Sequence, residues 1–296
     1  MRLFITGACG FVGRELVHHC KQQGINYVAV DIVPQNDPGY HQADIRSPDI
    51  VSLIPERVDA VIHLAGLTRD QDCRNKAHAC FDANVMATLN LMEAAQKKGA
   101  KQFIFASSEW VYGEWSAAMI KDEESPIDIT SLSSEYALSK LVSETNLRQK
   151  FRHGFCPVTI LRFGIIYGNR PANWAAVESI FNTVKTQDEI QVGSLRTARR
   201  FVHVSDIASG ILKAVGRDGF NIINLEGDKL VTLRDIIDVS SSILGKTVSI
   251  IEKNPGEPNV RNVSNERAKK EIGWQPTVTL HEGLAQLHAF LSARGA

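Results

Sequence analysis

The sequence predicts an α/β fold, in which a Rossmann-like doubly wound parallel sheet carries a smaller C-terminal α/β substrate-binding lobe. In the first half of the chain, apolar strand segments alternate with helical segments, which is typical of a parallel sheet covered by helices. Those strand segments contain almost no polar residues, as expected for strands that are buried on both faces. The first strand runs directly into a glycine-rich turn and a helix, which together can form a phosphate-binding site.

The composition is that of an ordinary globular protein. The chain has 296 residues, 44% of them hydrophobic and 22% charged, and its formal net charge is zero. A neutral chain gives no reason to expect nucleic-acid or membrane-surface binding, and no apolar run approaches the roughly 20 residues of a membrane helix. The first strand begins so close to Met1 that no room is left for a signal peptide, and the five scattered cysteines form no C-x-x-C pair. We therefore expect a cytoplasmic protein with free thiols.

The first half of the chain supplies the sheet. Apolar segments predict strands at 3–5, 27–31, 59–65, 102–108 and 157–163, with a short extended stretch that ends at Asp44. Apolar residues at helical spacing predict helices at 11–23, 49–56, 75–99 and 134–152. We expect residues 1–166 to form the sheet domain.

The second half is less regular. Helices are predicted at 178–186, 205–215, 232–244, 265–272 and 279–293, and strands at 189–192, 200–204, 221–225 and 248–252. We expect residues 200–225 to return to the sheet domain. Residues 167–199 and 226–296 are then expected to form the smaller substrate-binding lobe.

The glycine-rich turn after the first strand holds Gly7, Gly10 and Gly13. Glycine allows a tight turn and close approach of a phosphate to the backbone, and the first N–H groups of the following helix lack partners within that helix. Three glycines within seven residues are also compatible with an ordinary loop. The flanking strand and helix favour nucleotide binding.

Asp31 lies 18 residues after Gly13, at the end of the second predicted strand. An acid at this place can accept both ribose hydroxyls of an adenosine, and it repels a 2′-phosphate. The residues that follow it are Ile32 and Val33, with no Arg or Lys. The pattern favours NAD over NADP, although Asp31 is also compatible with a surface acid in a loop.

Tyr136 and Lys140 are four residues apart on a predicted helix, so they share one face of it. A nearby ammonium group favours the phenolate and is expected to lower the tyrosine pKa, which would make Tyr136 an acid/base catalyst near neutral pH. Ser107 and Ser108 end the fifth predicted strand, where a hydroxyl group can bind a substrate oxygen. Each feature alone has a structural explanation, but together they indicate a catalytic site. His63 lies in a buried strand and is expected to be a core histidine, and we expect no metal.

At this point the chain resembles the extended short-chain dehydrogenase/reductase family, in its NAD-dependent nucleotide-sugar epimerase/dehydratase branch. The resemblance covers almost the whole chain. It rests on the following motifs: TGACGFVG (6–13), Asp31, ADIR (43–46), HLAG (63–66), Asn84, SSEWVYG (107–113), YALSK (136–140), LRFGIIYG (161–168), RRFVHVSD (199–206) and GWQP (273–276).

The resemblance implies roles for individual residues. The residues it places at the NAD site are Gly7, Gly10, Phe11, Val12, Gly13, Asp31, Ile32, Asp44, Ile45, Leu64, Ala65, Gly66, Asn84, Tyr136, Lys140 and Phe163. Ser108 falls at the family's catalytic Ser/Thr, Tyr136 at its acid/base and Lys140 at the residue that binds ribose and lowers the tyrosine pKa. The resemblance also implies a homodimer through the helix at 75–99 and the Tyr136 helix.

The implied substrate side contains Arg199, at the position of an arginine that binds the diphosphate of a sugar nucleotide. Arg261 is expected to add a second anion contact, and Glu109 is either an acid in the site or a structural residue. Dehydratases of the branch carry an Asp-Glu pair after the Ser/Thr, but this chain has Glu109 and Trp110, so 4,6-dehydration is not expected.

Two further departures concern the substrate. Ile165 stands where the family often has an asparagine that contacts the diphosphate, and Asn169 replaces a common proline. The leading prediction is an NAD-dependent epimerase of a nucleotide-activated sugar, such as a UDP-hexose, acting by hydride transfer through a keto-sugar. The alternatives are an NAD-dependent dehydrogenase or reductase of a small alcohol, free sugar or uronate, and a non-catalytic NAD-binding sensor. The intact Ser108, Tyr136 and Lys140 argue against the sensor.

Overall fold

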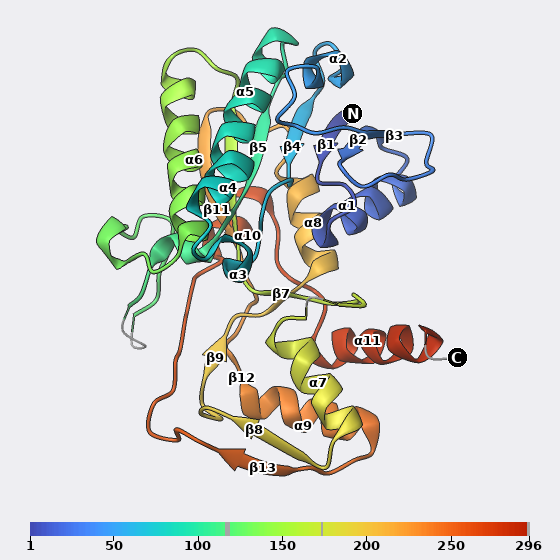
Figure 1. The fold of residues 1–296 in the computed structure, drawn as a ribbon, viewed down its shortest axis with the longest axis vertical. Coiled ribbons are helices and arrows are strands. Elements are labelled where there is room, and N and C mark those ends of the chain that lie inside the picture. Colours follow the sequence, from blue (N-terminus) through green and yellow to red (C-terminus); the bar gives the residue numbers. More distant parts are fainter. Residues whose placement is uncertain (116–118, 173, 295–296) are drawn as a thin grey trace.

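The computed structural model describes residues 1–115, 119–172 and 174–294, which form a larger lobe around a sheet and a smaller lobe below it (Figure 1). The sheet has seven strands in the order β11-β6-β5-β4-β1-β2-β3, and every neighbouring pair is parallel. In chain order the strands are β1 (Arg2–Thr6), β2 (Asn26–Asp31), β3 (Tyr40–Gln42), β4 (Ala60–His63), β5 (Phe103–Ser108), β6 (Val158–Phe163) and β11 (Phe220–Leu225).

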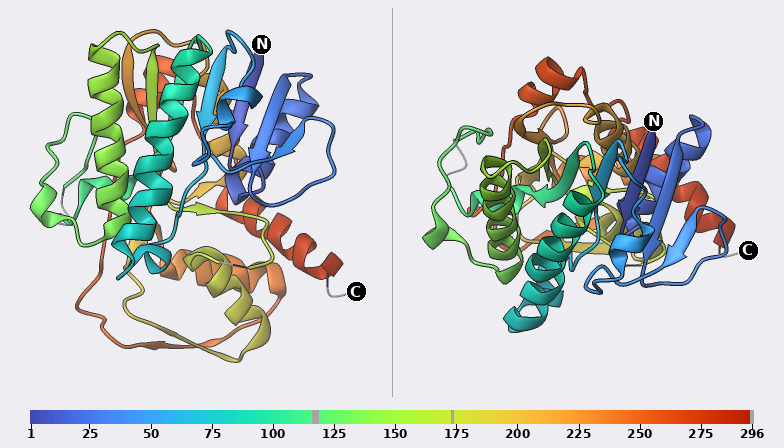
Figure 2. Two further views of the ribbon diagram at one scale, coloured as in Figure 1. Left: turned by 45° about the horizontal axis from the view of Figure 1, so that its top comes forward. Right: turned by 90° about the horizontal axis from the view of Figure 1, so that it is seen from above.

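Helices cover both faces of this sheet. One apolar cluster joins the sheet to α1 (Phe11–Gln22), α8 (Val204–Lys213) and α10 (Glu266–Ile272). A second cluster on the other face joins it to α2 (Ile50–Leu53), α5 (Ala87–Lys97) and α6 (Glu135–Arg152). Figure 2 shows α5 and α6 side by side along that face. This two-sided burial explains why the strands are mainly apolar, and it confirms the predicted doubly wound fold class.

The chain leaves the sheet after β6 and comes back to it at β11, which pairs with β6 from Phe220 opposite Val158 to Leu225 opposite Phe163. The carboxyl ends of β5, β6 and β11 therefore lie next to one another. Ligands in open α/β folds bind outside the carboxyl ends of the strands. In this chain that edge faces the smaller lobe (Figure 1).

The smaller lobe has its own apolar core, which includes Phe181, Ile236 and Leu287. Its helices are α7 (Ala176–Thr186), α9 (Leu233–Leu244) and α11 (Leu280–Arg294). Its strands are β8 (Glu189–Val192) with β13 (Ser249–Glu252), and β9 (Ala198–Arg199) with β12 (Val231–Thr232); β7 (Ile166–Tyr167) and β10 (Val202–His203) form a further pair near the junction. The division into an NAD-binding domain and a substrate-binding lobe stays a prediction. No helix among the described residues is long and apolar enough to cross a membrane.

Several boundaries differ from those predicted. The helix expected at 49–56 ends at Leu53, because Pro55 disfavours helical backbone at Ile54, which is extended. The helix expected at 75–99 consists of α4 (Ala77–Phe81), a π-helical turn η1 (Asp82–Met86) and α5, and a separate short helix α3 (Asp70–Cys73) precedes it. The strand expected to reach residue 65 ends at His63.

Candidate active site

The glycine turn has a shape that only glycine permits at two of its positions. Gly7 has a φ of +71°, and a Cβ there would lie 2.6 Å from the backbone nitrogen of Ala65. A Cβ at Gly13 would lie 2.1 Å from the carbonyl oxygen of Gly7. Gly10 is the N-cap residue of α1 and has no side chain to occupy the helix end, so the N–H groups that begin at Phe11 and Val12 are left for an outside partner. The turn therefore fits the diphosphate of a dinucleotide.

Asp31 also holds the glycine turn in place, which the sequence did not reveal. One of its oxygens, Oδ2, accepts a hydrogen bond of 2.9 Å from the backbone N–H of Cys9, and the other accepts one of 3.1 Å from Val33. The carboxylate thus fastens the glycine turn to the end of β2. A carboxylate has about four acceptor positions, so it keeps capacity for ribose hydroxyls. The adjacent Ile32 is 64% exposed.

Asn84 joins the loop after β4 to α6. Its Oδ1 accepts a hydrogen bond from the Leu67 backbone N–H at 2.8 Å, and its Nδ2 donates to the Leu67 carbonyl at 3.0 Å and to Ser139 Oγ at 2.9 Å. The side chain is buried, and it lies in the π-helical turn. Its hydrogen bonds hold the loop that begins with the predicted cofactor residues Leu64, Ala65 and Gly66. Asn84 therefore positions this loop, and a direct contact with NAD stays a prediction.

The remaining predicted cofactor residues occupy different environments. The Asp44 carboxylate is paired with Arg46 at 2.6 Å, which holds its pKa below the usual range. Ile45 packs in the core between the sheet and α5, so only its backbone can face a ligand. Phe163 is buried at the carboxyl end of β6, opposite Ser108 of β5.

Ser108 and Tyr136 meet at the carboxyl end of β5. Tyr136 lies in the first turn of α6, which begins after the N-cap Ser134, and its phenol lies close enough to Ser108 for that side chain to affect its ionisation. Both side chains are buried. Burial raises the pKa of Tyr136 to about 12, and the nearby Ser108 side chain acts in the opposite direction. The expectation that Tyr136 has a lowered pKa is wrong for this structure, because desolvation of the phenolate dominates.

Lys140 lies one helical turn after Tyr136. Its ammonium group donates a hydrogen bond of 2.8 Å to the Ala106 carbonyl and lies 5.9 Å from the centre of the Tyr136 ring. Burial lowers the pKa of Lys140 to about 8. The helix thus brings both groups to one place, as predicted, but the ammonium group is directed to the β5 backbone.

His63 is satisfied within the core. Its Nδ1 pairs with Thr6 Oγ1 and its Nε2 with Thr88 Oγ1, both at 2.9 Å, and burial lowers the pKa of His63 to about 3. The ring is therefore neutral near pH 7 and bridges β1, β4 and α5. In the described ranges, no group of three or more His, Cys, Asp or Glu side chains is arranged to hold a metal ion.

Two arginines approach the site from the other lobe. The Arg199 guanidinium donates to the Ala198 and Asn259 carbonyls and to Asn259 Oδ1, over 2.6 to 2.8 Å. Arg261 donates to the Gly113 carbonyl, and its guanidinium stacks on Trp110 and Trp115 at 4.9 and 4.7 Å.

The charges of Arg199 and Arg261 both act on the ionisation of Glu109, and the charges of Glu109 and Arg261 act on that of Arg199. The three side chains therefore lie near one another. The sequence did not reveal that Glu226, one residue after β11, also lies beside Glu109. The only sequence signal for a role of Glu226 was its position directly after the predicted strand 221–225. That strand is distant in sequence from Ser108, so nothing in the sequence alone placed the two residues together. These charged side chains converge because β5 and β11 end at the same edge of the sheet.

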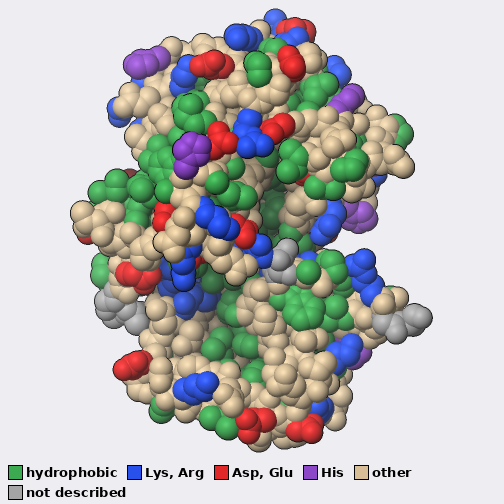
Figure 3. All heavy atoms as spheres, viewed as in Figure 1, with side chains coloured by type: hydrophobic (Ala, Val, Ile, Leu, Met, Phe, Trp, Pro, Cys, Tyr) green, Lys and Arg blue, Asp and Glu red, His purple; other side chains and the backbone are tan. Residues whose placement is uncertain are grey.

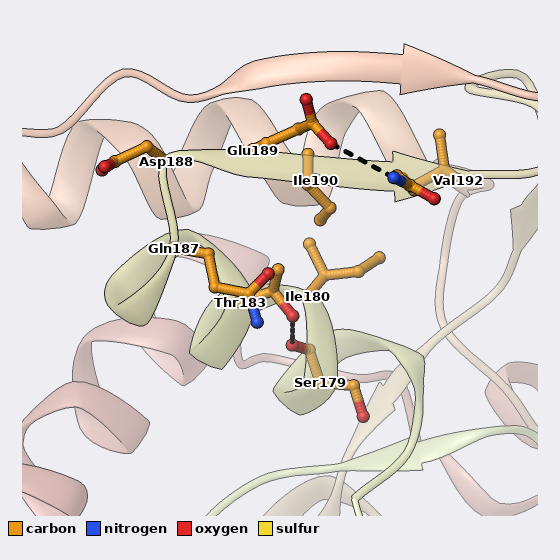
Figure 4. Close-up of a pocket in the computed structure, with 9 residues that line it drawn as sticks. Ser179, Ile180, Thr183, Gln187, Asp188, Glu189, Ile190 and Val192 are labelled. Atoms are coloured by element: carbon orange, nitrogen blue, oxygen red, sulfur yellow. Dashed lines mark hydrogen bonds between the residues drawn. The ribbon is translucent and has the colours of Figure 1, made fainter.

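The surface beyond this site is mixed. Figure 3 shows a notch between the two lobes, with positive and negative side chains interspersed on the face in view. A hollow of about 630 Å³ lies elsewhere, between α7 and β8, where Ile180, Ile190 and Thr183 line it (Figure 4). It includes none of the predicted catalytic or cofactor residues, so the chemistry is assigned to the sheet edge.

Residues 3–225 match the NAD dependent epimerase/dehydratase family. The chain belongs to this family. It is therefore an NAD-dependent enzyme of a family whose members are isomerases or oxidoreductases. The shape of the glycine turn and the free acceptor positions of Asp31 fit a dinucleotide, and contacts of the Tyr136 helix with NAD stay a prediction.

Three similar proteins illustrate the range of this family. The chain is 29% identical over 299 residues to a putative UDP-glucose 4-epimerase of Methanocaldococcus jannaschii, with 96% of each chain covered. It is 26% identical over 297 residues to the GDP-6-deoxy-D-mannose reductase of Pseudomonas aeruginosa, covering 96% of this chain and 94% of the other. A crystal structure of the UDP-glucose 4-epimerase from Thermotoga maritima with UDP-glucose superimposes with a TM-score of 0.87 over all of both chains at 22% identity, which shows the common fold.

Proposed function

We propose that this family member is an epimerase of a nucleotide-activated sugar, such as a UDP-hexose, that works by reversible oxidation of a ring hydroxyl group. The observation that carries the proposal is the buried contact between Ser108 and Tyr136, with Lys140 on the same face of α6. NAD, when bound, accepts a hydride from the sugar and can return it. The relatives named above act on UDP- and GDP-sugars by their names, which supports a nucleotide sugar as substrate.

Tyr136 is proposed to take the proton of the reacting hydroxyl group, and Ser108 to hold the same oxygen by a hydrogen bond. Lys140 is proposed to bind the ribose and to favour the phenolate of Tyr136. The nearby Ser108 side chain already favours that phenolate, whereas burial opposes it. A positively charged partner close to the ring is therefore needed for proton transfer near neutral pH.

On the substrate side, Arg199 and Arg261 are proposed to bind the diphosphate, and Glu109 to face the sugar. No carboxylate among the described residues lies within 4.0 Å of the Arg199 guanidinium, so its charge remains available to an anion. Glu114 lies 4.0 Å from Arg261 and is half-exposed, so it can be displaced.

A second candidate is an NAD-dependent dehydrogenase or reductase. Ile165 cannot supply the polar contact that an asparagine would give to a diphosphate, and this favours a substrate that is held differently. A reductase among the relatives also supports this candidate. A sensor without turnover is disfavoured by the complete set of Ser108, Tyr136 and Lys140.

The test combines binding and turnover. Thermal-shift measurements with UDP, GDP, dTDP and free sugars should show stabilisation by one nucleoside diphosphate, because a ligand of the folded state raises the melting temperature. Purified enzyme supplied with the matching nucleotide sugar should form the epimer without accumulating NADH. Stoichiometric release of NADH would overturn the epimerase and favour the dehydrogenase.

We also propose a cytoplasmic homodimer that forms through the helices of residues 77–97 and α6. These helices pack side by side on one face of the sheet, and Met86, within the first of them, is 57% exposed. The five cysteines carry free thiols, which fits a reducing compartment. Sedimentation of the wild type and of Met86→Glu checks the interface, since a charge at a dimer contact should yield monomers. A wild-type chain that sediments as a monomer at micromolar concentration would contradict it.

A further inference from the structure

Two glutamates that the proposed hydride chemistry does not use lie at the carboxyl edge of the sheet. Glu109 directly follows β5 and Ser108, and Glu226 directly follows β11. The two strands flank β6, so the side chains approach each other across the end of that strand. Each carboxyl group acts on the ionisation of the other, so the two lie near each other.

Both carboxyl groups are almost completely removed from solvent. Glu109 is 2% exposed and Glu226 is 0% exposed. Within the described part of the chain, Glu109 Oε1 and both carboxyl oxygens of Glu226 have no hydrogen-bond donor. Buried polar groups are nearly always hydrogen-bonded, so oxygens of this kind point to a proton that the pair shares and to a ligand that completes the site.

The backbone makes room for this arrangement at Gly164, the residue after β6. A Cβ at this position would lie 2.1 Å from Glu226 Oε2. The Glu226 carboxyl group therefore occupies the space that a side chain at 164 would fill, one residue beyond Phe163. This places it at the carboxyl end of β6, between the ends of β5 and β11.

Arginines surround the pair without neutralising it by direct contact. The charges of Arg199 and Arg261 act on Glu109, and those of Arg200 and Arg261 act on Glu226. The Nε of Arg261 is itself buried without a hydrogen-bond acceptor in the described residues. A polar ligand that enters here would meet the two carboxyl groups together with the unsatisfied Nε–H group of Arg261.

Burial raises the pKa of Glu109 and raises that of Glu226 well above its usual value, the nearby Glu109 charge adding to the second effect. Two adjacent carboxyl groups in a dry site cannot both ionise easily, so burial and mutual repulsion favour the state in which the pair shares one proton. A carboxylate with a raised pKa is also a stronger base than one in water. Such a pair is suited to moving a proton to and from a weak carbon acid.

We propose that Glu109 and Glu226 form a second acid–base pair, which exchanges a proton at the sugar carbon next to a ketone in the bound substrate. The proposal rests on the proposed function for the substrate class, a nucleotide sugar. Glu109 is the catalytic base because it adjoins Ser108, and Glu226 is a positioning residue that donates a hydrogen bond to it.

The step is balanced without a further reactant. The C–H bond next to the ketone breaks, and its proton goes to the Glu109 carboxylate. The electron pair left on carbon forms the enolate of the neighbouring carbonyl, which the surrounding arginine N–H groups stabilise. Return of a proton from Glu109 restores the ketone, and no net oxidation or reduction occurs.

The test uses the NAD-loaded enzyme in D₂O with a preformed nucleoside diphosphate 4-keto sugar, so that no hydride transfer is required. Mass spectrometry of the recovered sugar should show uptake of one deuterium at least about 100-fold faster than without enzyme. Because this assay bypasses oxidation, its failure is distinct from failure of the epimerase assay. Deuterium uptake at the uncatalysed rate, in an enzyme that epimerises nucleotide sugars, would overturn the second acid–base pair.

Variants assign the roles of the two residues. Glu109→Gln should reduce the exchange rate about 100-fold or more, because the base is lost. Glu226→Gln keeps a hydrogen-bond donor beside Glu109 and should retain exchange. Glu226→Met removes that donor, so it should slow exchange about tenfold and move the midpoint of its pH profile upward.

Glu114→Gln is the matched control, because Glu114 also lies near Arg261 but is half-exposed. It should leave the exchange rate unchanged. Exchange by Glu109→Gln at the wild-type rate would contradict the proposal, and so would identical pH profiles for Glu226→Met and Glu226→Gln. Melting temperatures of these four variants identify any that fail to fold. A further variant, Glu109→Asp, keeps a carboxylate and should restore part of the exchange that Glu109→Gln loses.

Discussion

The cofactor side and the substrate side of this site are built in different ways. The glycine turn, Asp31 and the loop after β4 form a surface from backbone atoms, and their side chains hydrogen-bond mainly to that backbone. On the substrate side, Glu109, Glu226 and the arginines are side chains brought together from distant segments.

This difference decides which kind of substitution alters each half of the site. A backbone surface depends on steric limits, so single glycines decide whether it exists. A cluster of buried charges depends on which partners meet, so one substitution changes its charge and the ligand that it can bind. The cofactor half is thus limited by backbone sterics, and the substrate half is where a single side-chain change alters the charges that a ligand meets.

The largest expected effect is at the junction of the two halves. Tyr136→Phe should lower turnover by about 10³-fold or more, because the phenol is the proposed acid/base, and it should leave NAD affinity nearly unchanged. Steady-state kinetics and NAD titration measure the two quantities. Tyr112→Phe is the control, since Tyr112 is equally buried and its hydroxyl group bonds Asn224 instead. Full activity of Tyr136→Phe would mean that the acid/base assignment is wrong.

The second prediction breaks the backbone surface of the cofactor half. Gly13→Ala should weaken NAD binding by about 100-fold and cost about 1–3 kcal/mol of folding free energy, because its Cβ would meet the Gly7 carbonyl. Fluorescence titration with NAD and urea unfolding measure these changes. Gly193→Ala, where a Cβ would meet nothing within 4 Å, should change neither. Normal NAD affinity in Gly13→Ala would contradict the assignment of the glycine turn to the diphosphate of NAD.

The third prediction concerns only the substrate half. Arg199→Gln should weaken binding of the nucleoside diphosphate by about tenfold, the value of one charge-assisted hydrogen bond, and should not change NAD affinity. Isothermal titration with the diphosphate that stabilises the wild type provides the measurement. Arg196→Gln is the control, because Arg196 bonds the Pro255 carbonyl on the same lobe and is not placed at the site. Equal losses of diphosphate affinity in both variants would show a general effect of removing a positive charge, and would contradict the role of Arg199.

The last prediction is a pH dependence of opposite sign in the two halves. His63 has a pKa of about 3 when folded and 6.5 as its ordinary value, so between these values the unfolded chain binds more protons. The unfolding free energy should therefore fall as pH is lowered through this window, by up to about 1.4 kcal/mol per pH unit. The raised pKa values of Glu109 and Glu226 act oppositely, because the folded chain holds the extra proton and loses stability as pH rises above about 4.5.

Urea unfolding from pH 4 to 8 separates the two contributions. His63→Gln should flatten the acid side of the stability curve, and Glu226→Gln should flatten the neutral side. Parallel curves for wild type and His63→Gln would mean that His63 titrates normally in the folded chain.

Periodicity and turn chemistry predicted most of the fold, because these are local properties. Strands buried on both faces produce uninterrupted apolar runs, and Ser134 and Thr232 cap the helices that follow them. The π-helical turn at Asn84 was not predictable. It arises where Asn84 and its carbonyl group are held by Leu67, Ser139 and Ser143, which lie on other elements.

The amino-acid sequence by itself determined the cofactor half, because the glycine turn and Asp31 depend on spacing along the chain and on backbone sterics. It also determined that Tyr136 and Lys140 share one helical face. Only the tertiary structure decided the ionisation of these groups, since desolvation depends on what packs around them. It likewise decided that Glu226 meets Glu109, because parallel strands far apart in sequence end at one edge of the sheet.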